Sequence, residues 1–274
     1  MADATAPLIR TVRAGRHVEI LLDNPGGLNT FTPRFQQELV AALDAAAENE
    51  ACGAVILAGT GRTFCVGQDL RERDPRKWTA PPDLTRSVRN FYNPLIRRIR
   101  AMPMPTVCAV NGIAAGAGVG IALACDIVLA SDKARFILAF SRIGLVPDGG
   151  TSWHLARRLG EARALALTLT GGELSATEAA EGGLIWKAFA DEGLMDEARA
   201  LAGQLADGPR YGLTLAREAI RAAAGSDLDT QLELEAELQG RAARSPDYAE
   251  GVLAFLEKRP ARFTGEGERD PAAP

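Results

Sequence analysis

The sequence has few of the residues that build metal sites and disulfide frameworks. Among its 274 residues are two histidines, His17 and His154, which lie far apart, and four cysteines without a C-x-x-C spacing. Zinc sites need several such ligands at close spacing, and disulfide frameworks need paired cysteines in an oxidising compartment. We therefore expect no metal site. We expect reduced core residues at Cys52, Cys65, Cys108 and Cys125.

Long apolar runs and a strong excess of one charge are also missing. No apolar stretch reaches the length of a membrane span, and the first residues, MADATAPLIR, lack the apolar segment of a secretory signal. A net charge of −4 and a pI near 5.4 give no general attraction to nucleic acid or anionic membranes. We expect a cytoplasmic protein without nucleic-acid or membrane partners, in which local cations meet any anionic ligand.

The sequence does contain an alternation of short apolar strands and amphipathic helices. Strands are predicted at 18–22 and 54–57, and between them Thr32 and Pro33 are typical of a helix start. This order predicts an α/β layer architecture. Later in the chain helices dominate, at 162–169, 176–181, 194–206, 212–225, 229–244 and 246–258, and residues 266–274 are expected to form a disordered tail.

The chain is organised around residues 106–126, TVCAVNGIAAGAGVGIALACD. A strand at 106–110 leads into glycines, and the apolar run 121–125 predicts a buried helix whose N-terminus faces them. Unpaired N–H groups at such a terminus favour an anion, or an oxygen that becomes anionic. The alternative is that the glycines only allow tight packing of strand and helix. A dinucleotide loop is excluded, because it needs G-x-G-x-x-G and an acid about 20 residues later.

Two further segments are predicted to follow strands. Residues 62–70, RTFCVGQDL, come after the strand at 54–57, where ligand sites of α/β folds are common. The charged, proline-containing residues 71–94 form either a mobile loop or short helix over the site, or a solvated excursion without function.

A helix is expected at 91–101 and strands at 127–130 and 135–139. The loop 144–151 then precedes a helix at 152–159.

Four motifs in order resemble the crotonase, or enoyl-CoA hydratase/isomerase, superfamily. They are FCVGQDL (64–70), AVNG (109–112) with its glycine run, GLVPDGGT (144–151) and EGVLAFLEKR (250–259), and LNTFT (28–32) adds to them. Together they span nearly the whole chain. The resemblance implies a spiral of β-β-α units over 1–205, and a C-terminal helical region over 206–265 that forms trimers, often paired as a dimer of trimers.

The resemblance also implies an acyl-CoA thioester as the ligand. Its thioester oxygen would be held by the main-chain N–H groups of Gln68 and Ala117; the second donor is commonly glycine in the superfamily, but alanine keeps the N–H. Removing a proton next to the thioester carbonyl places charge on that oxygen, so such donors act mainly on the transition state. No metal or redox cofactor is implied.

The proton carriers distinguish members of the superfamily. Hydratases use two glutamates, and the matching positions here are Gly120 and Phe140, neither of which transfers a proton. Asp148 matches the carboxylate of isomerases and of a dehalogenase group, and we expect it to be the general base, with a pKa raised by an apolar pocket. From the residues alone, Asp148 could instead cap the following helix in a Pro-Asp-Gly-Gly turn.

Four residues match positions that contact CoA in the superfamily: Arg62, Arg71, Phe255 and Lys258. The two arginines would lie near the phosphates and adenine, and the other two would contact the CoA of a neighbouring subunit. The alternatives are surface cations and a helix-packing aromatic. We expect Asp69 to orient its loop, and Trp153 and His154 to be packing residues.

Further stretches of likeness, at 139–148, 183–186, 228–235 and 244–252, point to a subgroup of isomerases that convert a ring epoxide of phenylacetyl-CoA to an oxepin. The resemblance thus predicts this reaction, in phenylacetate catabolism, together with 3-enoyl/2-enoyl-CoA isomerisation. GGTSW at 149–153 departs from the subgroup's CGGTW. The alternatives are an enoyl-CoA hydratase, a dehalogenase with Asp148 as nucleophile, and a non-catalytic acyl-CoA-binding protein.

Overall fold

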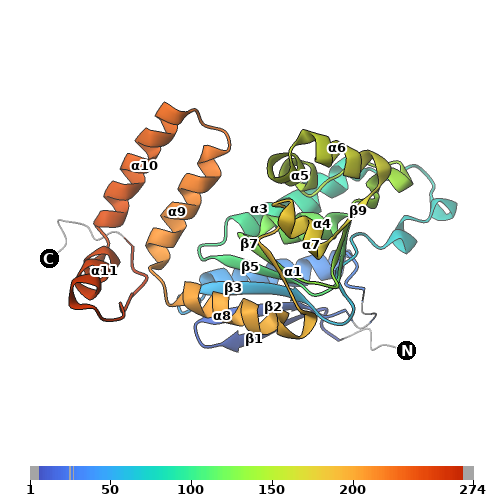
Figure 1. The fold of residues 1–274 in the computed structure, drawn as a ribbon. Helices are drawn as coiled ribbons and strands as arrows, with labels where there is room; N and C mark the ends of the chain where they lie inside the picture. Colours follow the sequence, from blue (N-terminus) through green and yellow to red (C-terminus); the bar gives the residue numbers. More distant parts are fainter. Residues whose placement is uncertain (1–5, 25, 27, 268–274) are drawn as a thin grey trace.

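The computed structural model of the chain describes residues 6–24, 26 and 28–267, and their strands form two sheets (Figure 1). The six-stranded sheet has the order β1-β2-β3-β5-β7-β10, and the four-stranded sheet has the order β4-β6-β8-β9. The strands are β1 (Ile9–Ala14), β2 (His17–Leu22), β3 (Ala54–Gly59), β4 (Thr63–Cys65), β5 (Thr106–Val110), β6 (Ile113–Ala115), β7 (Ile127–Ser131), β8 (Arg135–Ile137), β9 (Glu173–Ser175) and β10 (Lys187–Phe189).

Successive strand pairs cross from the larger sheet to the smaller one. Strands β3, β5 and β7 lie side by side in the six-stranded sheet. The strands that follow each of them in the chain, β4, β6 and β8, lie side by side in the four-stranded sheet. The pairings β2–β3, β3–β5 and β5–β7 are parallel, as are β4–β6 and β6–β8, whereas β1 and β9 are antiparallel to their partners. This repetition is the predicted spiral of β-β-α units.

Eleven α-helices and several shorter turns connect and cover these strands within the described ranges. The α-helices are α1 (Pro33–Glu48), α2 (Leu84–Ser87), α3 (Asn93–Arg100), α4 (Ala117–Ala124), α5 (Thr151–Leu159), α6 (Glu161–Thr170), α7 (Ala176–Glu181), α8 (Leu194–Ala206), α9 (Arg210–Ala223), α10 (Leu228–Ala243) and α11 (Pro246–Glu257). The 3₁₀ turns are η1 (Leu70–Arg73), η2 (Pro75–Lys77), η4 (Ala139–Ile143) and η5 (Asp191–Gly193), and η3 (Val88–Tyr92) is a π-helical turn.

The larger sheet is buried on both faces, as its parallel strands require. Ala54, Ile56 and Ala58 of β3 pack with α8, whereas Val55 and Leu57 belong to the larger cluster on the opposite face. Helices α1, α3 and α4 contribute to that larger cluster. The start of α1 is as predicted, because the Thr32 side chain accepts a hydrogen bond from the Phe35 N–H at 3.2 Å.

The central helix begins earlier than the sequence suggested. We predicted a helix at 121–125 preceded by a glycine loop, but α4 begins at Ala117 and contains Gly118 and Gly120. Glycine is a poor helix former, so the sequence pattern did not indicate that the helix begins at Ala117. Packing explains it, because a Cβ atom at Gly118 would lie 2.1 Å from the Cys65 carbonyl oxygen. The helix therefore needs glycine in order to lie against β4.

Other predicted boundaries also move. The strand expected at 135–139 ends at Ile137, and η4 follows it; the helix expected at 91–101 begins at Asn93, directly after the π-helical turn. Residues 71–94, predicted as a loop or short helix, contain several short helical turns, among them η2, α2 and η3. The four cysteines are free and buried as predicted.

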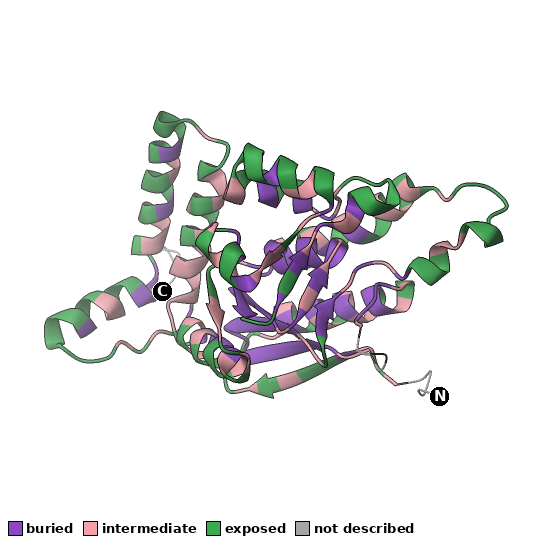
Figure 2. Ribbon diagram, turned by 45° about the vertical axis from the view of Figure 1, so that its right-hand side comes forward, coloured by how far each residue is buried: buried purple, intermediate pink, exposed green. Residues whose placement is uncertain are grey.

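After α8 the chain leaves the sheets and continues as α9, α10 and α11 (Figure 1). Helices α10 and α11 form a C-terminal arm that extends away from the sheets, and most of its surface is exposed (Figure 2). No helix in the described ranges is long and apolar enough to cross a membrane. Of the tail predicted at 266–274, residues 268–274 lie outside the described residues, and Glu266 donates its N–H to the Thr264 hydroxyl at 3.2 Å.

Candidate active site

Two short parallel strands bring the predicted oxyanion donors together. Gln68 follows β4, and Ala117 follows β6, which pairs with β4. Gly67 has a φ of +79°, and a Cβ atom there would lie 3.0 Å from the Ala115 carbonyl oxygen and 3.3 Å from the Ala117 nitrogen. Both the positive φ and the close approach require glycine at this point. The backbone just before Gln68 is therefore in contact with the backbone of Ala117.

The N–H groups of Gln68 and Ala117 are left without acceptors by the local hydrogen bonding. The Phe31 N–H donates to the Gly67 carbonyl at 2.7 Å, and the Asp69 N–H donates to the Phe31 carbonyl at 3.3 Å, so the Gln68 N–H points elsewhere. Ala117 is the first residue of α4, and Gly116 has no side chain to cap it. Across the described ranges neither N–H has a hydrogen-bond partner in the chain. The helix N-terminus adds partial positive charge at Ala117.

Asp148 lies half-buried in the loop between η4 and α5. Its Oδ1 atom is inaccessible to solvent and has no hydrogen-bond partner in the described structure. Burial raises the pKa of this carboxyl from 3.8 to about 6. Helix α5 begins at Thr151 after Gly150, with no side-chain cap. Asp148 therefore does not cap α5, and its raised pKa is in the range that suits a group exchanging protons near neutral pH.

The loop of Asp148 rests directly on the helix that begins at Ala117. A Cβ atom at Gly120 would lie 2.4 Å from the Gly149 carbonyl oxygen and 2.9 Å from the Thr151 hydroxyl oxygen. Since Gly149 belongs to this loop and Thr151 directly follows it, the absence of a side chain at Gly120 allows the loop of Asp148 to lie on the helix that begins with the predicted oxyanion donor. The second position matching a hydratase glutamate is filled by the buried Phe140, whose ring tip would lie 4.0 Å from a Cβ atom at Gly116.

Tyr92 contacts the side chain of Gln68, which the sequence analysis did not predict. Its hydroxyl donates to the Gln68 side-chain carbonyl oxygen at 2.6 Å, and the Gln68 amide nitrogen donates to Glu72 at 3.0 Å. Tyr92 closes the η3 turn, and π-helical turns are frequent at functional sites. The contact joins residues 24 positions apart, so only the fold reveals it. The sequence signal was limited to a tyrosine at the start of an amphipathic helix.

Asp69 and Arg71 form one unit at the start of η1. The Asp69 carboxylate accepts the Arg71 N–H at 3.0 Å and pairs with the Arg71 guanidinium at 2.6 Å. The Arg71 guanidinium beside it lowers the pKa of Asp69. Arg62 is exposed in the turn between β3 and β4. Thus both predicted CoA-binding arginines are exposed, Arg62 before β4 and Arg71 after Gln68, and Arg71 is already paired.

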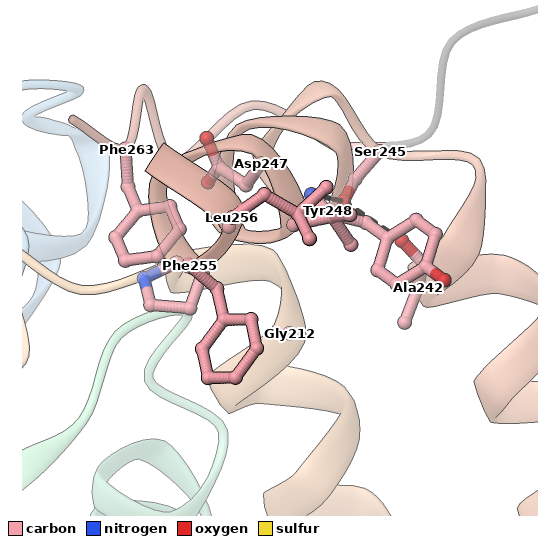
Figure 3. A pocket seen from close by; sticks show the side chains of 11 residues that line it. Gly212, Ala242, Ser245, Asp247, Tyr248, Phe255, Leu256 and Phe263 are labelled. Carbon is pink, nitrogen blue, oxygen red and sulfur yellow. Dashed lines mark hydrogen bonds between the residues drawn. The ribbon is translucent and has the colours of Figure 1, made fainter. Parts of the chain in front are cut away.

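Phe255 and Lys258 lie in a different part of the chain. Phe255, with an exposed fraction of 82%, belongs to α11, and Lys258 ends that helix in a left-handed conformation. Phe255 lines a hollow of about 450 Å³ with residues of α9 and α10 (Figure 3). Figure 1 shows α11 at the opposite end of the molecule from the segment that follows β4. Within one chain these residues are therefore not brought together with Asp148.

Trp153 and His154 pack against neighbouring side chains. His154 is buried, and burial together with nearby arginines lowers its pKa to about 3, so the imidazole is neutral. Two guanidinium groups lie close to the Trp153 ring, with 5.0 Å from Arg100 and 4.2 Å from Arg157 to the ring centroid. Neither arrangement provides a proton carrier at neutral pH.

Comparisons with known proteins show the family of the chain. Residues 16–266 match the family described as enoyl-CoA hydratase/isomerase. A 1,2-epoxyphenylacetyl-CoA isomerase of Escherichia coli is 47% identical over 91% of this chain and 97% of that protein. A probable enoyl-CoA hydratase of Rhodobacter capsulatus is 44% identical over 90% and 93% of the two chains. The crystal structure of an enoyl-CoA hydratase from Bacillus anthracis matches with a TM-score of 0.88 and 31% identity, over 94% of this chain and all of that chain (100%).

Proposed function

The chain belongs to the enoyl-CoA hydratase/isomerase family, and from that premise we propose that it isomerises acyl-CoA thioesters through an enolate. The proposed reaction is the conversion of 1,2-epoxyphenylacetyl-CoA to oxepin-CoA, with accompanying movement of a double bond between the 3,4 and 2,3 positions of enoyl-CoA. Support for the ring epoxide comes from the 47% identical relative that carries this activity in its name. The proposed setting is phenylacetate catabolism in the cytoplasm.

In this proposal Asp148 removes a proton from the carbon next to the thioester carbonyl. The N–H groups of Gln68 and Ala117 hold the oxygen on which the negative charge develops. The proton then returns to a ring carbon, and the bond between the two epoxide carbons opens to give the seven-membered ring. For a 3-enoyl-CoA, the proton returns to the γ-carbon and the double bond moves. Both reactions are net isomerisations, which balance without an oxidant, a reductant or a resident cofactor.

One observation supports the proposal most directly. A buried carboxylate oxygen of Asp148 has no hydrogen-bond partner, and its loop lies on α4, the helix that begins with Ala117. Hydration needs a second proton carrier to position water, and the two positions where hydratases of the family hold glutamate are here a glycine and a phenylalanine. A pure acyl-CoA binder has no use for a desolvated carboxylate, whose burial costs free energy.

We further propose that the chain works as a trimer or a dimer of trimers. Asp148, Gln68 and Ala117 lie in the core, whereas Phe255 and Lys258 lie on the arm, so a neighbouring subunit has to supply those two contacts to the same CoA (Figure 1). Arg62 and Arg71 would lie toward the phosphates and adenine, and Asp69 would fix the orientation of Arg71.

The test is the turnover of a 3-enoyl-CoA and of crotonyl-CoA by the wild-type protein and by Asp148→Asn. We expect the variant to lose isomerisation by roughly 10²–10⁴-fold, the usual contribution of a general base, with little hydration by either protein. Asp132→Asn, at an exposed position after β7, is the matched control and should isomerise normally.

Strong hydration of crotonyl-CoA that survives Asp148→Asn would contradict the assignment. If the wild-type protein turns over neither substrate, the ring epoxide itself is the next substrate. Binding of acyl-CoA without turnover of any of the three would identify a non-catalytic protein.

A further inference from the structure

Tyr92 is held rigidly by groups that do not belong to its own helix. Its side chain is 7% exposed, and its ring stacks on Phe31 with centroids 5.5 Å apart and planes inclined by 20°. Phe31 is itself tied by backbone hydrogen bonds to Gly67 and Asp69, on either side of Gln68. The tyrosine ring is therefore fixed to the same segment that supplies the proposed oxyanion donor.

The face of the helix that bears Tyr92 is directed at the loop of Asp148. Ile96 lies one turn after Tyr92, and its side chain would be 3.7 Å from a Cβ atom at Gly150 and 4.0 Å from one at Gly149. The charge of Asp148 also adds to the effect of burial in raising the pKa of Tyr92 above its usual range. The phenol thus contacts Gln68 and stands on the helix face that packs against the Asp148 loop, and it stays protonated at neutral pH.

A protonated phenol in this place is a hydrogen-bond donor with one proton to give. In the structure that proton is given to the Gln68 side-chain oxygen at 2.6 Å. The Gln68 amide group also donates to Glu72 at 3.0 Å, in an exposed hydrogen bond. The Tyr92–Gln68 hydrogen bond is only partly buried. Exchanging one neutral oxygen acceptor for another has a small net cost, so a ligand oxygen can replace the Gln68 side-chain oxygen as the partner of Tyr92.

We propose that Tyr92 determines specificity for acyl groups that carry an oxygen atom on or beside the ring, by donating its hydroxyl hydrogen to that oxygen in place of Gln68. This rests on the proposed function, in which the acyl group lies between the oxyanion donors and Asp148. The hydrogen bond holds the ring in the orientation in which the α-carbon faces Asp148. An acyl group without such an oxygen leaves the Tyr92–Gln68 hydrogen bond in place.

The first experiment compares two substrates in the wild-type protein and in Tyr92→Phe. For the ring epoxide, we expect kcat/KM to fall about 10-fold in the variant, the usual consequence of losing one hydrogen bond. For a 3-enoyl-CoA, which has no ring oxygen, we expect a change of less than about twofold. Tyr211→Phe, a tyrosine of α9, is the matched control and should change neither value.

A second experiment separates this inference from the proposed reaction, because it needs no turnover. Binding of 2-methoxyphenylacetyl-CoA and of 2-ethylphenylacetyl-CoA, which differ by one oxygen in place of one methylene, is measured by calorimetry. We expect the wild-type protein to prefer the methoxy compound by about 5- to 10-fold and Tyr92→Phe to show no preference. The ratio within each protein does not depend on the fraction that is correctly folded.

Equal losses on both substrates, with an unchanged preference between the two ligands, would show that Tyr92 acts only on the structure around Gln68, and would overturn the inference. No effect of the substitution on either measurement would overturn it as well. If the wild-type protein does not convert the epoxide but shows the methoxy preference through Tyr92, the proposed reaction fails and the inference stands.

Discussion

Arg217 of α9 and Asp126, which follows α4, form an ion pair with 3.0 Å between the guanidinium nitrogen and the carboxylate oxygen. Arg221, one turn later, approaches the other oxygen of Asp126 at 2.6 Å. The Thr106 N–H and hydroxyl also donate to the same carboxylate. Because α9 leads to the arm, this carboxylate fixes the direction in which the arm leaves the core.

Asp126→Ala should therefore destabilise the protein strongly. Removing one partner leaves two partly buried guanidinium groups without their carboxylate, which typically costs about 3–5 kcal/mol. Denaturant unfolding measures the loss, and limited proteolysis should show cleavage between α8 and α9. Arg76→Ala, which breaks the exposed pair with Asp74, is the control and should leave the unfolding midpoint unchanged. Equal midpoints for both variants would show that the buried pair does not anchor α9.

Gly120→Ala should damage both stability and activity. The added methyl group overlaps with the Gly149 carbonyl oxygen, and overpacking of this kind costs about 1–3 kcal/mol. The loop must move, and a misplacement of about 1 Å at Asp148 is expected to lower kcat by up to about 10²-fold. Thermal unfolding and isomerase kinetics test this together.

The matched glycine variant is Gly203→Ala in α8, where no atom lies within 4 Å of the added methyl group. Alanine is the better helix former, so we expect a gain of about 0.5–1 kcal/mol and normal turnover. A Gly120→Ala variant that behaved like this one would mean that the loop adapts without cost.

The pH dependence of activity should report Asp148. The carboxyl has a pKa of about 6 in the folded protein and is the base only when it is deprotonated. We expect kcat/KM for a 3-enoyl-CoA to rise with pH and to level off above an apparent pKa of about 6. Initial rates between pH 4.5 and 8, a range of about two units on either side, test it. A flat profile would exclude Asp148 as the proton acceptor.

The Asp148 carboxyl should also make the stability of the protein depend on pH, but stability should fall as pH rises, whereas activity should rise. Its pKa is raised from 3.8 in the unfolded chain to about 6, so the folded protein binds the proton more tightly. Stability is therefore lost as pH rises through this window, by up to roughly 3 kcal/mol, and the loss persists above it. Relative to the wild-type protein, Asp148→Asn should gain stability between pH 4 and pH 7, as measured by denaturant unfolding. A difference that does not change with pH would contradict the raised pKa.

Much of the fold follows from local sequence rules. The Thr32 cap, the parallel strands β3 and β5, and the bounds of α8 are where apolar periodicity and capping residues place them. The errors occur where tertiary packing overrides local preference. Helix α4 contains Gly118 and Gly120 because neighbouring backbone needs the space, and no propensity scale contains that information.

The sequence named the residues of the candidate site, whose roles stay a prediction, but it did not show their contacts. Glycine spacing and the family resemblance singled out Gln68, Ala117 and Asp148, and the fold shows how β4, β6 and α4 bring their surroundings together. The choice between base and helix cap at Asp148 depended on where α5 begins, a boundary that the turn sequence left open. Tyr92 could not be predicted, since its partner is distant along the chain.

The contact of Gly149 with Gly120 also limits which side chains position 120 can hold. The carbonyl oxygen of Gly149 occupies the place where a side chain at position 120 would begin, so a glutamate there and the present course of the Asp148 loop exclude each other. Any larger side chain at position 120 therefore requires the loop to take another course first.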